Sequence, residues 1–139
     1  MDQKNYRFNR KDGNIYLEVG KELQNIGSSL QIIVLSSTKP SWEQPFPNTP
    51  FQYWVRLIFL NNNGDLCNAL LNNGTTNALT NWMNYVAQVR MKYELYEMIT
   101  TISLVESDGD YFDYSFAGIS GKPGLGDRMK KLISSLALN

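Results

Sequence analysis

The order of its apolar segments is the feature that most constrains how this chain folds. Short segments rich in β-branched and aromatic residues lead in, and one helix, expected to start at Thr75 or Thr76, interrupts them. A tight hairpin and a last amphipathic segment follow. We therefore predict a mainly β (α+β) fold, in which a small, partly open barrel carries an inserted capping helix and a C-terminal amphipathic helix.

The expected strands follow from alternation and turn residues. Residues 5–9 and 14–19 flank Asp12-Gly13, a dipeptide typical of hairpin turns, while residues 21–27 are interpreted as a connector or a short helical turn. Further strands are predicted at 30–37, 51–60, 66–71, 98–106 and 111–116. Residues 37–50 contain four prolines, so we expect a long loop there.

The segment 51–60, FQYWVRLIFL, is the strongest predicted strand. Alternation assigns Phe51, Tyr53, Val55, Leu57 and Phe59 to one face, which we interpret as core. The other face carries Trp54 and Arg56, a pair that burial does not readily explain.

Length and composition restrict the function classes. With 139 residues the chain is sized for one domain, in which we assign 1–118 to the barrel and 119–139 to a glycine-rich exit and the last helix. Thirteen basic and thirteen acidic residues cancel, so a strong electrostatic grip on nucleic acid is not implied. The N-terminus lacks an apolar leader and no apolar run is long enough to span a membrane, which favours a cytoplasmic protein with no membrane partner.

No catalytic or metal-binding pattern emerges from the sequence. Histidine is absent, and the single cysteine, Cys67, lies among apolar residues, where an inert buried thiol is expected. The acidic residues at 106–113 lack the spacing of a calcium loop, and the glycine-rich segment 121–127 places its lysine too early for a phosphate loop. We therefore expect a protein that is not an enzyme and has no cofactor and no metal.

Aromatic and basic residues suggest a binding surface instead. Proteins that bind single strands stack bases on aromatic side chains and hold phosphates with Lys or Arg. The candidate nucleic-acid-binding residues are Trp54, Arg56, Trp42, Lys39 and Arg7. Packing within the sheet is the alternative explanation for the aromatic residues, and for Trp54 and Trp42 both explanations stay open.

Three stretches resemble OB-fold single-stranded-DNA-binding proteins of phages and plasmids. LQIIVLSSTKPSW at 30–42 is similar to the strand and loop that begin the barrel, and LLNNGTTNALTNWMNYV at 70–86 to the passage from a strand into the helix. Residues 99–116 are similar to the closing hairpin. The resemblance implies a barrel whose sheet face and rim loops contact a strand, here through Trp54, Arg56 and the loop with Lys39 and Trp42.

Two functions remain as hypotheses. The first is a non-enzymatic module that binds single-stranded nucleic acid, DNA or RNA. The second is a protein-interaction adaptor or assembly subunit of a larger phage or mobile-element complex, or a homo-oligomer. Its expected protein-contact residues are Phe46 in the proline-rich loop and four residues of the last helix: Met129, Leu132, Ile133 and Leu136.

Overall fold

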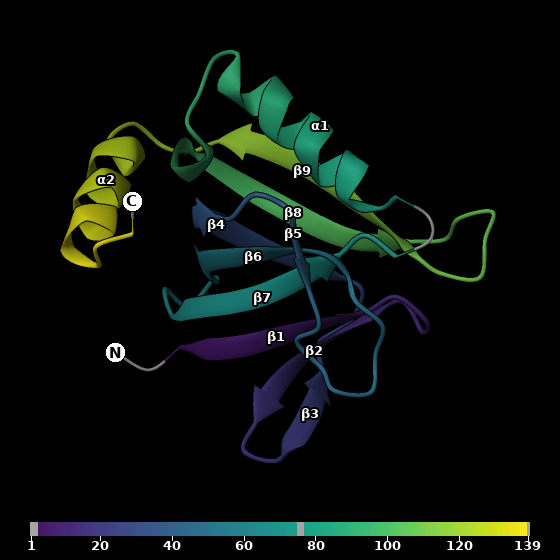
Figure 1. Ribbon diagram of the computed structural model, residues 1–139. Helices are drawn as coiled ribbons and strands as arrows, with labels where there is room; N and C mark the ends of the chain where they lie inside the picture. Colours follow the sequence, from purple (N-terminus) through teal and green to yellow (C-terminus); the bar gives the residue numbers. More distant parts are fainter. Residues whose placement is uncertain (1–2, 75–76, 139) are drawn as a thin grey trace.

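The computed structural model describes residues 3–74 and 77–138, and most of the ordered backbone lies in strands (Figure 1). The strands are β1 (Lys4–Asn9), β2 (Asn14–Val19), β3 (Glu22–Asn25), β4 (Ser29–Ser37), β5 (Ser41–Glu43), β6 (Gln52–Leu60), β7 (Leu66–Asn72), β8 (Met98–Val105) and β9 (Asp113–Ser120). The helices are α1 (Leu79–Arg90), a 3₁₀ turn η1 (Leu95–Glu97) and α2 (Leu125–Ser135).

The strands form one strongly curled sheet with the order β3-β2-β1-β7-β6-β4-β8-β9. An antiparallel meander of β4, β6 and β7 is followed by α1, and the β8–β9 hairpin then returns to pair with β4. This half-barrel with α1 over β9 confirms the predicted mainly β, OB-like, partly open barrel with an inserted helix and a C-terminal helix (Figure 1).

The N-terminal hairpin enlarges this barrel on its open side. The predicted β1–β2 hairpin is confirmed, and β1 pairs in parallel with β7, so that Arg7 lies opposite Leu70. Gly13 closes the hairpin turn at a positive φ of 76°. Residues 21–27 were expected to be a connector or helical turn, and this expectation is wrong: β3 pairs there with β2.

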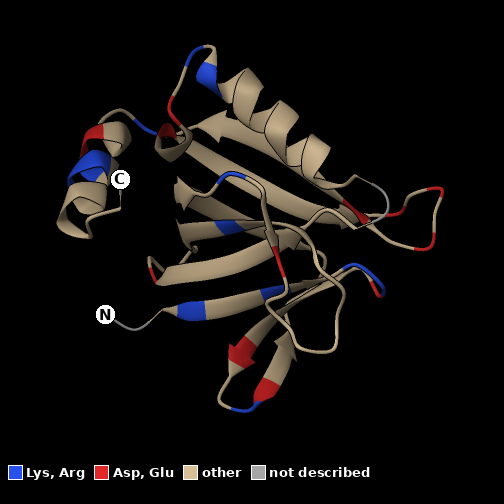
Figure 2. Cartoon of the chain, in the orientation of Figure 1, with Lys and Arg blue, Asp and Glu red and all other residues tan. Residues whose placement is uncertain are grey.

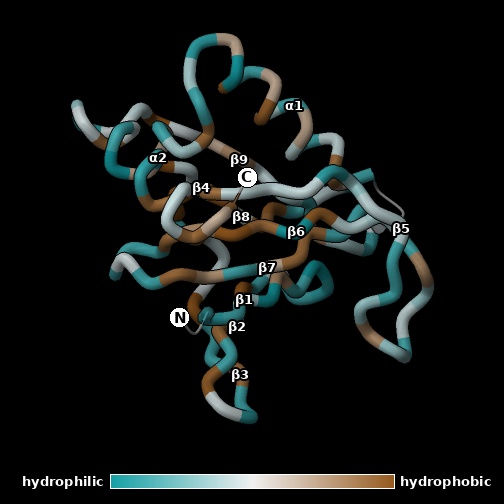
Figure 3. The backbone as a smooth tube through the Cα atoms, turned by 60° about the vertical axis from the view of Figure 1, so that its left-hand side comes forward, coloured by the Kyte–Doolittle hydropathy of each residue, from teal (hydrophilic) through white to brown (hydrophobic). Residues whose placement is uncertain are grey.

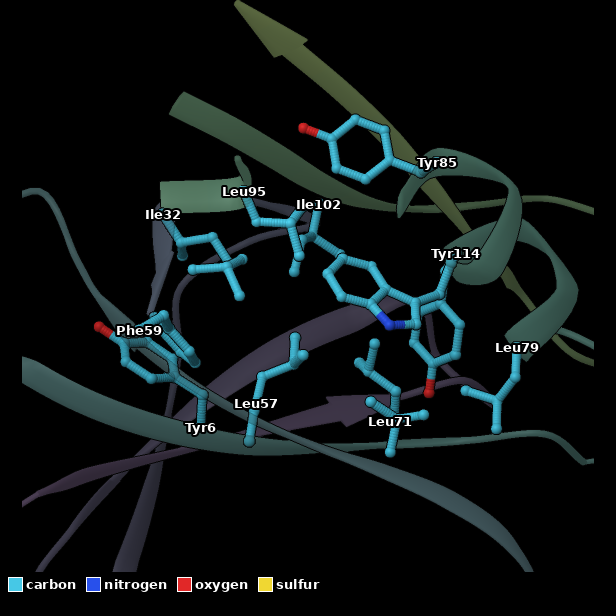
Figure 4. Close-up of a cluster of buried hydrophobic side chains, with 14 of the residues drawn as sticks. Tyr6, Ile32, Leu57, Phe59, Leu71, Leu79, Tyr85, Leu95, Ile102 and Tyr114 are labelled. Carbon is cyan, nitrogen blue, oxygen red and sulfur yellow. The ribbon is translucent and has the colours of Figure 1, made fainter. Parts of the chain in front are cut away.

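The core lies between the inner face of the sheet and α1 (Figure 4). Val55, Leu57 and Phe59 are fully buried, as the alternation in residues 51–60 predicted. The same alternation fails at the start of the segment, where Phe51 and Tyr53 are exposed. At this end of β6 the partner is β5, and the exposed ring of Trp42 lies against Tyr53.

The helices do not begin where the expected caps placed them: α1 begins later in the chain, and α2 begins earlier. Thr75 and Thr76 lie outside the described residues, and α1 begins at Leu79, whose amide donates to Asn73 Oδ1 at 3.2 Å. In α2 the residue before the helix is Gly124 rather than Asp127. The exit that precedes α2 is also short, since β9 continues to Ser120.

The last helix packs on the chain's own sheet. Leu125 and Met129 are buried in a second apolar cluster with Leu35 of β4 and Leu66 of β7. Leu132, Ile133 and Leu136 join its margin. The apolar face of α2 therefore covers one part of the outer wall of the half-barrel.

The proline-rich segment covers a further part of the outer wall, at Trp54 and Arg7. It is not loop throughout, because β5 pairs with the first residues of β6. Beyond β5, residues 44–51 form a loop that projects beside the sheet (Figure 3) and reaches the outer face of β1 and β6.

Candidate functional site

The part of the outer face that α2 leaves uncovered carries a row of cations. Cross-strand register places Arg7 of β1 opposite Leu70 of β7, and Leu70 opposite Arg56 of β6. Tyr16 of β2 lies on the other side of Arg7 in the same row. Residues directly opposite one another share a face, so two arginines and a tyrosine line one side of the sheet.

Trp54 shares the face of Arg56, as the alternation predicted, but its ring is buried beneath the proline-rich loop. Only 8% of Trp54 is exposed, and the ring of Phe46 packs on it edge to face, with centroids 5.8 Å apart. The indole Nε1 is buried and makes no hydrogen bond within the described residues. A base therefore has no open face of Trp54 to stack on while Phe46 is in place.

The two arginines of the row differ in their surroundings. The Arg7 guanidinium donates from Nε to a Glu18 carboxylate oxygen at 2.6 Å and lies over the Phe46 ring, 5.3 Å from its centroid. Arg56 is exposed, and its guanidinium forms no ion pair within the described residues. Arg56 is thus the cation most available to a phosphate.

Amide side chains lie on either side of this row. The Asn68 amide donates to Asn5 at 2.6 Å and to Gln3 at 2.9 Å, and the Asn72 amide donates to Gln52 at 3.2 Å. Asn5, Asn68 and Asn72 border a hollow of about 470 Å³ that Arg7, Phe46 and Trp54 also line. Amides both donate and accept, which suits the edges of bases.

Tyr16 lines the same hollow and is held at its hydroxyl. That hydroxyl donates to the Asp12 carboxylate, and this hydrogen bond raises the pKa of Tyr16 above its ordinary value. Tyr16 is therefore protonated at neutral pH and adds no negative charge to the row.

Trp42 does not lie on this face. Trp42 is opposite Tyr53, and their rings meet edge to face with centroids 5.1 Å apart. Trp42 is 59% exposed, and Lys39 is exposed in the connection between β4 and β5. The structure therefore brings Arg7, Trp54 and Arg56 together on one face of the sheet. Trp42 lies on the opposite face, near the start of β6.

Sequence reasoning missed the structural role of Arg10. Its guanidinium is buried and donates to the Phe112 carbonyl at 2.7 Å and to the Asp113 carboxylate at 3.0 Å. Tyr111 and Tyr114 lie beside it, with ring centroids 5.7 and 5.4 Å away. Arg10 ties the first hairpin to the residues that lead into β9, and nothing in its local sequence signals a contact across about a hundred positions.

A second hollow, of about 780 Å³, lies between α1 and the loop that joins β8 to β9. Glu106, Asp108 and Asp113 line it, and acidic residues gather in that loop (Figure 2). Carboxylates repel phosphate, which makes the hollow beside Arg7 the better candidate for a polyanion.

Further observations bear on other classes of site. Cys67 is fully buried, as expected. Within residues 3–74 and 77–138, no three His, Cys, Asp or Glu side chains gather in a group that could hold a metal ion. The same residues include no helix with the length and apolar character needed to cross a membrane.

Comparison with known proteins identifies no relative from which a function could be transferred. No protein-family model matches the chain, and no curated protein or solved structure matches it significantly.

Proposed function

We propose that this protein is a non-enzymatic, cytoplasmic module that binds single-stranded nucleic acid along the outer face of β6, β7 and β1. The observation that supports the proposal most is the row Arg7, Leu70 and Arg56, which lies beside an amide-lined hollow and the aromatic pair Phe46 and Trp54. In OB folds the second and third strands and two rim loops contact the polymer. Here β6 and β7 are the second and third strands of the β4-β6-β7 meander.

A single strand fits this surface better than a duplex. Duplex binding draws mainly on many phosphate contacts, and this chain has no net charge. A single strand also offers its base faces and edges to aromatic and amide groups. Trp42, on the other side of the same sheet end, adds an exposed ring at the rim.

The few available cations predict a weak salt dependence. Arg56 and Lys39 are exposed, and Arg7 is already paired with Glu18. For single strands the logarithm of the affinity falls by about 0.7 per neutralised phosphate for each decade of salt, so two to three contacts predict a slope of about −1.4 to −2.1.

Titration of fluorescein-labelled oligo-dT, followed by anisotropy at several salt concentrations, tests the proposal. Binding at low salt with a slope in this range is expected, and Arg56→Ala should make the slope shallower by about 0.7. Arg90→Ala, in the last turn of α1 and away from this face, is the matched control and should change neither quantity. Absence of binding at low salt would contradict the proposal.

One observation favours the alternative of an adaptor or assembly subunit of a phage or mobile-element complex. Trp42, Phe51 and Tyr53 are all large, exposed and close together at the start of β6. Exposed aromatic side chains in a cluster are typical of the centres of protein interfaces. α2 contributes less to this alternative than expected, because its apolar residues pack within the chain.

A further inference from the structure

Phe46 occupies the aromatic centre of the proposed interface. Its ring contacts the Trp54 indole, with centroids 5.8 Å apart, and the Arg7 guanidinium, which lies 5.3 Å from the ring centroid. An indole and a guanidinium are also the partners on which unpaired bases stack in single-strand sites. Phe46 therefore makes the contacts that a bound base would make.

The closed position of Phe46 leaves a polar group unsatisfied. Trp54 Nε1 is buried, and it has no acceptor within the described residues. A buried donor without an acceptor is unfavourable, and most such groups in proteins are paired. If the loop moved away, this N–H would reach water or an acceptor on a ligand.

The loop that carries Phe46 is held together by hydrogen bonds among its own residues. Gln44 Nε2 donates to the Thr49 carbonyl at 2.8 Å, and the Thr49 amide and hydroxyl donate to the Phe46 carbonyl at 3.1 and 2.8 Å. In the described structure, no hydrogen bond joins residues 44–50 to the sheet. The ring of Phe46 is thus a principal contact between this loop and the face beneath it.

We infer that Phe46 substitutes for one unpaired base in the free protein and is displaced when a single strand binds. The base then takes its place against Trp54 and Arg7, next to the hollow of about 470 Å³ that these residues line. This inference rests on the proposed function. It adds that the loop regulates binding, because Phe46 and the nucleic-acid strand compete for contact with Trp54 and Arg7.

Removal of an aromatic side chain from a binding site usually weakens binding. Because Phe46 competes with the strand, its removal should strengthen binding instead. Phe46→Ala should bind an oligo-dT of about 16 nucleotides, the upper end of the site size of one OB fold, more tightly than the wild type. The expected gain is about fivefold, which is the lower end of a base-stacking contact, about 1 kcal/mol, converted at 1.4 kcal/mol per tenfold. Phe46→Leu keeps an apolar cover without a ring and should gain in the same direction.

Phe51→Ala is the matched control, since Phe51 is an exposed aromatic residue at the end of the same loop, with no ring contact to Trp54. Its affinity should equal that of the wild type. In a Trp54→Leu background, the gain from Phe46→Ala should disappear, because the base no longer has the indole to stack on. Circular dichroism of each variant shows that the compared proteins are folded.

The outcomes separate the inference from the proposed function. Wild-type binding with equal or weaker binding by Phe46→Ala overturns the inference and leaves the proposed function standing. A gain that persists in the Trp54→Leu background also overturns it. Binding by Phe46→Ala alone supports the inference, whereas binding by neither protein rejects both.

Discussion

Cys67 illustrates how burial of one side chain contributes to the response of the protein to alkali. Burial raises the pKa of the thiol from its ordinary value of 9.0 to about 11. Between these values the unfolded chain loses the thiol proton and the folded chain keeps it, so unfolding becomes more favourable as the pH rises. The contribution of the protonated thiol to the free energy of unfolding is fully present below pH 9, and it is lost as the pH rises through about 11.

Urea unfolding at a series of pH values measures this effect. The free energy of unfolding should fall by about 1–3 kcal/mol across the window because of Cys67. Cys67→Ser lacks the titrating thiol, so its unfolding free energy should fall less steeply over the same range. Parallel pH profiles for the two proteins would contradict the assignment.

The residues of the candidate site show what local patterns predict. Period-two alternation placed Trp54 and Arg56 on one face, and this is confirmed. It could not show that Trp54 is buried, because the covering ring of Phe46 comes from a loop rather than from the strand. Nor could it place Arg7 in the same row, since the parallel pairing of β1 with β7 joins residues about sixty positions apart.

At the scale of elements, the first hairpin depends on Arg10. Arg10→Met should remove the hydrogen bonds to Phe112 and Asp113 and leave a carboxylate without this partner. Loss of one partner of a buried pair costs about 3–5 kcal/mol, and we expect the lower end because Asp113 keeps 26% side-chain exposure.

Arg7→Met is the matched control for this prediction, because it breaks an ion pair in the same hairpin whose arginine is far more exposed than Arg10. Exposed pairs contribute about 0–1 kcal/mol, so its midpoint of urea unfolding should move much less. Equal losses in the two variants would show that Arg10 does not fasten the hairpin.

The elements that the sequence did not reveal share a physical cause. The four residues of β3 are all exposed and lack apolar alternation, so they form a strand only because β2 provides a partner. β5 lies between prolines, and its three residues are ordered by pairing with β6. The long apolar segments of β4, β6 and β8 were predictable because each buries its own side chains.

For the whole molecule, the position of α2 determines whether the last helix stabilises the fold or drives assembly. Its residues Leu125 and Met129 bury themselves against Leu35 and Leu66. A chain that ends at Ser120 would expose this cluster. Burial of a Leu or Met side chain contributes roughly 1.5–3 kcal/mol, so loss of the two helix residues alone should cost about 3–6 kcal/mol.

Light scattering and urea unfolding of the full and shortened chains test this role. We expect the shortened chain to unfold more readily and to scatter as larger, associated particles, because exposed apolar surface promotes aggregation. In the full chain, Met129→Ala should destabilise by about 2 kcal/mol, and exposed Lys130→Ala by less than about 0.5 kcal/mol. If the full chain is instead an oligomer that becomes a folded monomer when α2 is removed, the helix is an assembly element, and the alternative function gains its main support.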